Sequence, residues 1–198
     1  MNFVTAPQSE DPEDESTNKA TAASCCLVEV ARTVRSDIIA PGSPVLQFIE
    51  SRIQSANWRE REAATMAFAQ ILDGPDQDRI STLVSSAFGL ILQHTQDAHP
   101  IVKETALWTV SKICDLCPET INEQQLQHVM QALDAGLRDG PKVANLACSA
   151  IHNLASSSDV DDETQTCMLS QYFTGLVQRL WATTERCVCA QRFTHLAV

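Results

Sequence analysis

Apolar residues recur at three- and four-residue spacing through most of this chain, from about residue 18 onward. This spacing places them on one face of a helix, so it predicts amphipathic α-helices rather than strands. Glycine and proline interrupt the pattern, as at Asp73-Gly74-Pro75, where glycine can adopt the left-handed conformation that ends a helix and proline cannot continue it. The predicted elements are one helix over 18–36, helix pairs over 41–72, 77–117 and 122–156, and one helix over 165–183.

The helix pairs are copies of one unit. Arg61-Glu62-Ala63-Ala64 matches Lys103-Glu104-Thr105-Ala106 at an offset of 104 − 62 = 42 residues, and Ala147 matches Ala106 at 147 − 106 = 41. Two helices with this period are typical of HEAT repeats. One pair cannot bury its apolar face alone, so consecutive pairs must stack. We therefore predict an all-α fold, a right-handed α-solenoid of HEAT repeats.

Both ends differ from the repeats. Residues 1–17 are polar and acidic, which predicts a disordered acidic segment because too few apolar side chains are present to order it. Residues 184–198 lose the helical period, which predicts an irregular tail. The helix over 18–36 would be the second (B) helix of a pair and that over 165–183 the first (A) helix. The chain is therefore expected to be a fragment of a longer array.

Composition narrows the classes of partner. The formal net charge of -11 disfavours nucleic acid and favours basic proteins or peptides. No run of about 18 apolar residues is present, so no membrane span is expected.

Of the eight cysteines, six fall in apolar helical stretches, where a free thiol acts as a small hydrophobe. With no signal peptide at the start, they indicate a reducing compartment. The six are Cys25, Cys26, Cys114, Cys117, Cys148 and Cys167.

Enzymatic chemistry is not indicated. Cys187, Cys189 and His195 lack the spacing and the fourth ligand of a zinc site. No histidine is accompanied by the third group and oxyanion loop that cysteine catalysis needs, and no phosphate-binding glycine motif occurs. We predict a binding protein with no cofactor.

Specific stretches resemble the importin-beta (karyopherin-beta) family. Residues 57–68, Asn-Trp-Arg-Glu-Arg-Glu-Ala-Ala-Thr-Met-Ala-Phe, are similar to a motif of that family, and so are residues 71–75, 103–110 and 113–119. The resemblance runs in register from about residue 10 to residue 183, and residues 184–198 fall outside it. It suggests the middle HEAT repeats of a longer transport receptor, including its acidic loop.

The resemblance implies a spiral scaffold for nuclear import that shuttles between cytoplasm and nucleus. Such receptors bind the basic segment of an importin-alpha adaptor, the GTP-bound form of the small GTPase Ran, and phenylalanine-glycine nucleoporins. The acidic run stands where the family carries an acidic loop associated with Ran and with the adaptor. That run comprises Glu10, Asp11, Glu13, Asp14 and Glu15. A solubilising tail is the plainer interpretation of the same residues.

Tryptophans supply the second part of the implied site. Trp108 matches a family tryptophan on which basic adaptor side chains pack, although a tryptophan within a helix can equally be core. Ser149 stands where the next repeat of the family has another tryptophan. Trp58, at a helix start, is expected to pack between repeats.

Glu62 and Glu104 share one face of successive B helices. There they would contact basic side chains of a partner, or else pair locally with Arg61 and Lys103. Two functional alternatives stay open: a HEAT scaffold of the phosphatase-regulatory type, and an inactive truncated product.

Overall fold

The computed structural model describes residues 19–157 and 167–195, and the regular structure within these ranges is entirely helical. The all-α solenoid expected from the sequence is confirmed. In chain order the elements are α1 (Lys19–Val34), the 3-10 turn η2 (Arg35–Ile39), α2 (Pro44–Arg52), α3 (Trp58–Ile71), α4 (Gln77–His94), α5 (Pro100–Leu116), η3 (Pro118–Thr120), α6 (Glu123–Arg138), α7 (Pro141–Ser156), η4 (Ser170–Tyr172) and α8 (Phe173–His195).

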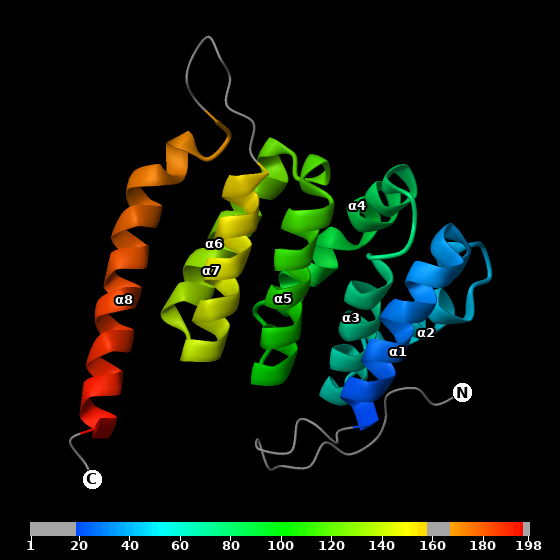
Figure 1. The fold of residues 1–198 in the computed structure, drawn as a ribbon, viewed down its shortest axis with the longest axis horizontal. Helices are drawn as coiled ribbons and strands as arrows, with labels where there is room; N and C mark the ends of the chain where they lie inside the picture. The colour runs from blue at the N-terminus through cyan, green and yellow to red at the C-terminus, as the bar shows by residue number, and fades with distance from the viewer. Residues whose placement is uncertain (1–18, 158–166, 196–198) are drawn as a thin grey trace.

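The helices succeed one another in space as they do along the chain. The B helices α1, α3, α5 and α7 contact each other in turn and stand side by side, while α2, α4 and α6 are the A helices that pair with α3, α5 and α7 (Figure 1). At the far end of the row α8 contacts α6 and α7. The main contacts among the described repeats are therefore between neighbours, as the stacking argument requires.

Helix starts follow the local chemistry of the sequence. The Asn57 side chain accepts a hydrogen bond from the backbone N–H of Arg59 at the start of α3 (3.1 Å), and Asn122 forms a capping box with Gln125 at the start of α6. Pro100 and Pro141 occupy first-turn positions, where the missing N–H has no helical partner to lose. Asn57, Pro100 and Pro141 start B helices and so lie in the turns within helix pairs, whereas Asn122 starts an A helix and lies between two pairs.

The core is one cluster that runs along the array from Ala31 to Leu169. Small residues let the B helices approach closely: Ala64, Ala106 and Ala147 are fully buried. Cys114 and Cys117 belong to this core, and burial raises the pKa of both thiols to about 12, so neither is a thiolate at neutral pH.

Cys148 packs against this core from α7 as expected, whereas Cys25, Cys26 and Cys167 differ from the helical core positions expected for them. Cys25 and Cys26 are exposed on α1, whose main helix contact among the described residues is with α3. Cys167 lies in the turn before α8 rather than within a helix. Helical periodicity placed these thiols on the correct elements or beside them, but it did not give their burial.

The prediction of an irregular tail over residues 184–198 is wrong for residues 184–195, which are helical. The last helix begins at Phe173 instead of residue 165 and continues to His195 instead of ending at residue 183. Two polar contacts join α8 to the end of α6 where the extension begins: Thr183 Oγ1 donates to the Leu137 carbonyl (3.2 Å), and Arg186 Nη2 donates to the same oxygen (2.6 Å). Residues 184–198 lack the helical period of apolar residues, so hydrophobic periodicity did not predict this extension.

Gly74 also has a different role from the one predicted. The positive-φ residues in the described ranges are Arg35 and Gly42, so Gly74 does not use the left-handed region. A Cβ at position 74 would instead lie 2.1 Å from the Ala31 carbonyl oxygen. Glycine is needed there because the backbone of α1 passes too close to the turn to leave room for a side chain.

None of the described helices is long and apolar enough to cross a membrane.

Candidate partner-binding surface on the B helices

Trp108 lies midway along α5, half-buried, with one cation fixed beside its ring. Lys112, one turn further along α5, places Nζ 5.2 Å from the ring centroid. That ammonium is also held by Asp73 Oδ2 (2.5 Å), in the turn after α3, and by the Ala69 carbonyl (3.0 Å), near the end of α3. The indole therefore already takes part in a cation–π contact, the type of interaction that a basic partner would extend.

Trp108 is the aromatic member of a column that crosses three B helices. Met66 on α3 and Ser149 on α7 occupy the equivalent positions, since 108 − 66 = 42 and 149 − 108 = 41. Met66 is half-buried, and Ser149 is exposed with its hydroxyl bonded to the Asn145 carbonyl (3.1 Å). A partner crossing this column would meet a thioether, an indole and a hydroxyl in succession.

Glu62 does not lie on the open surface where a basic partner could reach it. Its side chain is buried between α3 and α5, with the residue only 7% exposed, and Thr105 Oγ1 donates to Oε1 at 3.3 Å. Glu104, one repeat further on, is half-buried. The structure therefore leaves only Glu104 of these two carboxylates partly accessible, because the α5 hydroxyl covers the first.

The local pairing considered for these glutamates does not occur either. Arg61 pairs with Asp97 and Lys103 pairs with Asp139, so both cations reach the turn of the following repeat. Exposed Asp115 and half-buried Asp73 add negative charge at the C-terminal side of Trp108. Glu10, Asp11, Glu13, Asp14 and Glu15 lie outside the described residues.

Replacing Glu62 by Gln should stabilise the protein at neutral pH. Burial raises the pKa of Glu62, and the hydrogen bond from Thr105 opposes this only in part. The folded state thus binds this proton more tightly than the unfolded state does, so the ionised carboxylate lowers the stability of the protein at neutral pH. That stability is regained as the pH falls through the raised pKa toward the usual value of 4.5. Gln removes the charge and keeps an acceptor for Thr105.

Urea unfolding from neutral pH down to below the usual glutamate pKa measures this effect. The gain from Glu62→Gln should be largest at neutral pH and disappear at the acid end. Glu104→Gln, at the equivalent position one repeat on, is the control and should change stability by less than about 0.5 kcal/mol. A gain that is the same at every pH would show that the charge of Glu62 is not its cause.

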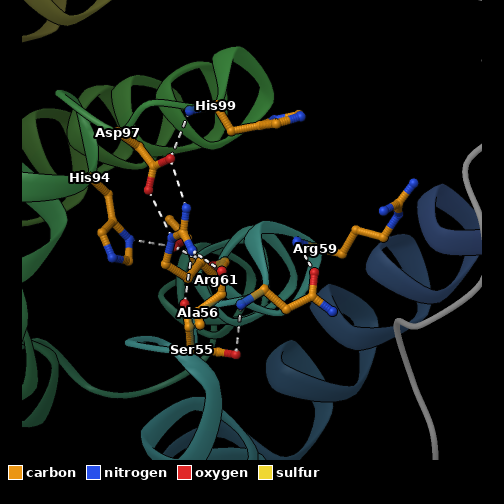
Figure 2. A network of polar contacts seen from close by, with 9 residues as sticks. Ser55, Ala56, Arg59, Arg61, His94, Asp97 and His99 are labelled. Carbon is orange, nitrogen blue, oxygen red and sulfur yellow. Dashed lines mark hydrogen bonds and ion pairs between the residues drawn. The ribbon is translucent and has the colours of Figure 1, made fainter.

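A polar network fixes the spacing of the repeats that carry this surface (Figure 2). Arg61 makes a two-pronged contact with Asp97, Nε to Oδ2 at 2.8 Å and Nη2 to Oδ1 at 2.9 Å. Its Nη1 also donates to the carbonyls of Ser55 (2.8 Å) and Ala56 (3.1 Å). Arg61 thereby joins the turn of its own helix pair to the turn of the next.

The Asp97 carboxylate completes this junction. It accepts from the backbone N–H of His99 (2.8 Å), and the Arg61 hydrogen bond lowers its pKa. Lys103 and Asp139 repeat the pair one unit on, at 2.7 Å. The signal for both pairs was in the sequence, since 103 − 61 = 42 and 139 − 97 = 42.

Two further contacts reinforce the junction. Trp58 stacks on His99 with ring centroids 3.6 Å apart and an interplanar angle of 8°, which confirms that Trp58 packs between repeats. Thr65 Oγ1 lies 3.0 Å from Nδ1 of buried His94, and burial lowers the pKa of that imidazole. These aromatic and polar contacts hold α3 against the end of α4 and the turn that leads into α5.

Two family models match the chain. A HEAT-like repeat model covers residues 58–113, and a model described as importin subunit beta-1-like TPR repeats covers residues 128–196. Importin subunit beta-1 of Saccharomyces cerevisiae is 42% identical over 155 residues, which are 78% of this chain and 18% of that protein. Importin subunit beta-1 of Arabidopsis thaliana is 34% identical over 186 residues, 90% of this chain and 21% of that protein.

Solved structures agree with the sequence comparisons. Yeast importin-beta (Kap95p) superposes with a TM-score of 0.78 at 38% identity, covering 87% of this chain and 20% of that one. An importin-beta crystallised from polyethylene glycol gives a TM-score of 0.82 at 29% identity, over 89% of this chain and 21% of that one. The chain belongs to the importin-beta family. It spans about a fifth of the length of the importin-beta relatives it matches.

The importin-beta comparisons also correct the expected limits of the resemblance. The family match continues to residue 196, so the expectation that residues 184–198 fall outside the family is wrong over nearly all of that range. Although one model is described by TPR repeats, the 41–42-residue offsets exceed the TPR period of about 34 residues and fit HEAT repeats.

Proposed function

We propose that this chain contributes a protein-binding surface to a nuclear transport receptor that shuttles between cytoplasm and nucleus. Its membership of the importin-beta family supports this, and the relatives it matches are importin subunits rather than enzymes. One structural neighbour is Kap95p, whose binding induces the switch loops of RanGDP to adopt the GTP-bound conformation. Another is Kap95 in its complex with Nup1. Ran and a nucleoporin are the partners that these neighbours suggest.

The observation that carries the proposal is the Trp108 surface in a chain of net charge -11. An indole at the surface accepts the aliphatic stem of a lysine or the plane of a guanidinium. Glu104 and Asp115 lie on the same helix and can attract the charged ends. The partner proposed for this surface is the basic segment of an importin-alpha adaptor.

The acidic run would act before the tryptophan does. Consecutive carboxylates raise the encounter rate with a basic segment without needing a fixed geometry. GTP-bound Ran would compete for the same carboxylates and release the adaptor. This order of events rests on the family resemblance together with the charge of Glu10, Asp11, Glu13, Asp14 and Glu15.

A groove on the other side of the array suits the nucleoporin partner. It is an open groove between the A helices α4 and α6 with a volume of ≈ 650 Å³. Its lining includes the partly exposed side chain of Leu92 and the polar side chains of Gln93 and Gln131, together with the buried residues Phe88 and Ala132. A phenylalanine ring would find apolar surface there, and the glutamines could bond to the peptide backbone on either side of it.

Titration of the chain with a lysine- and arginine-rich adaptor peptide tests the main proposal. Binding should weaken as salt is raised, and Trp108→Ala should lower the affinity at least about tenfold because it removes the central aromatic contact. Trp181→Ala is the matched control, because Trp181 is 69% exposed on distant α8 and should leave the affinity unchanged. Equal affinities of the Trp108 variant and the unaltered chain would reject this surface as the peptide site.

A further inference from the structure

Lys112 already occupies the cation site that the Trp108 surface offers. Its ammonium lies 5.2 Å from the indole centroid, 2.5 Å from Asp73 Oδ2 and 3.0 Å from the Ala69 carbonyl oxygen. The Lys112 and Asp73 side chains are only 17% and 18% exposed, so this charge is largely withdrawn from solvent. An aromatic face, a carboxylate and a carbonyl are groups that a protein surface presents to a bound lysine, and here a lysine of the same chain fills them.

The charge of Lys112 is not needed for the contact between neighbouring B helices. Gln70 on α3 and Asn153 on α7 occupy the equivalent positions, since 112 − 70 = 42 and 153 − 112 = 41. Asn153 Nδ2 donates to a backbone carbonyl of α5 (3.0 Å), as Lys112 does to one of α3, and Gln70 Nε2 donates to a hydroxyl of α1. A neutral amide therefore makes the same kind of bridge. Of α3, α5 and α7, only α5 combines a cation at this position with an aromatic ring one turn before it.

Glu104, Trp108 and Lys112 follow one another at four-residue spacing and lie on one face of α5. A basic side chain of a partner that reaches the indole is therefore attracted by Glu104 on one side and repelled by Lys112 on the other. It does not find Asp73 free either, because that carboxylate is already paired with Lys112. The aliphatic stem of the partner can still pack on the ring, with its charge directed toward Glu104.

We propose that Lys112 is an internal competitor for the cation site formed by Trp108 and Asp73, and that it weakens the binding of basic segments so that they are released quickly. This inference rests on the proposed function, since it takes Trp108 as the contact for a basic segment. Lys112 loses little freedom in occupying the site, because it is held on the same helix as the ring. A lysine or arginine of the partner must displace it or bind beside it. Affinity differences of this kind act mainly through the dissociation rate.

Replacing Lys112 by Gln tests the proposal with the lysine- and arginine-rich adaptor peptide. The affinity should rise about fivefold, mainly through slower dissociation, because the indole and the Asp73 carboxylate become available to the peptide. Glutamine is the residue at the equivalent position of α3 and keeps a donor for the Ala69 carbonyl, so helix content and the urea midpoint should change little. Lys112→Arg keeps the cation and should bind no more tightly than the unaltered chain.

Lys142→Gln is the matched control for net charge. It removes one positive charge from an exposed position at the start of α7 and should tighten binding by less than about twofold, an effect that added salt should abolish. The ratio of the Lys112→Gln affinity to that of the unaltered chain should persist in salt, because the Lys112–Asp73 contact is largely shielded from solvent. A double-mutant cycle with Trp108→Ala should show that most of the gain requires the indole.

The outcomes separate this inference from the proposed function. A peptide that binds through Trp108 but no more tightly to Lys112→Gln would overturn the inference alone. A gain of the same size in the Trp108→Ala background would also overturn it, because Lys112 would then act only through net charge. Binding that is independent of Trp108 in every variant, or no binding to any variant, would overturn both proposals.

Discussion

Replacing Gly74 by Ala should destabilise the protein by about 2–3 kcal/mol and loosen α1 from the array. The added Cβ would lie 2.1 Å from the Ala31 carbonyl oxygen and 2.5 Å from its carbonyl carbon. Both are backbone atoms of a residue that is completely buried, so no side-chain rotation can relieve the overlap. Either α1 or the turn that follows α3 must move, and the α1–α3 packing is lost.

Urea unfolding and hydrogen exchange together measure this effect. The midpoint should fall, and the amides of α1 should exchange faster than those of α5 if the damage is local. Gly89→Ala is the control: no atom lies within 4 Å of its Cβ, and it sits on an exposed face inside α4, where alanine should stabilise by up to about 1 kcal/mol. A Gly74→Ala variant as stable as the unaltered chain would mean that α1 does not cross the turn so closely.

The array was predictable from sequence because each repeat meets the same surroundings as the one before. Positions 42 residues apart, such as Arg61 and Lys103, therefore carry side chains of the same kind. Gly74 shows the limit of such reasoning. A helix-ending Asp-Gly-Pro predicts a left-handed glycine, but contact with Ala31, more than forty residues earlier, is what requires the glycine here.

The two glutamates show why the candidate site could be predicted only in part. Glu62 and Glu104 occupy one repeat position, and local sequence gives no reason to separate them. Glu62 is buried under Thr105, whose hydroxyl donates to it. The residue equivalent to Thr105 in the next repeat is Leu146 (146 − 105 = 41), which has no hydroxyl to donate. Accessibility depends on the neighbouring helix, so it emerges only once the repeats are stacked.

Replacing Asp97 by Ala should cost about 3 kcal/mol, because it leaves the Arg61 guanidinium without its carboxylate. The two side chains are only 8% and 18% exposed, and they join by two hydrogen bonds. Asp139→Ala breaks the equivalent pair with Lys103, where the side chains are 37% and 24% exposed and one bond joins them. Solvent screens that pair, so its loss should cost no more than about 1 kcal/mol.

Double-mutant cycles separate the ion pair from the packing of each side chain. The Arg61–Asp97 cycle should give a larger coupling free energy than the Lys103–Asp139 cycle, since the first pair is less hydrated. Equal couplings would mean that burial does not set the strength of these contacts.

The pH dependence gives an independent check on the Asp97 pair. Arg61 lowers the pKa of Asp97, so the folded state releases this proton more readily than the unfolded state. The stability it supplies is complete above the usual aspartate value of 3.8 and is lost as pH falls through the lowered pKa. The destabilisation caused by Asp97→Ala should therefore shrink in acid, because protonated Asp97 no longer pairs with Arg61. The stabilisation gained by Glu62→Gln should shrink in acid as well, because protonated Glu62 no longer carries a buried charge. At neutral pH the two substitutions should change the free energy of unfolding with opposite signs, and both changes should approach zero in acid. This pattern distinguishes Asp97, a carboxylate that joins two repeats, from Glu62, a carboxylate buried between repeats without a cation.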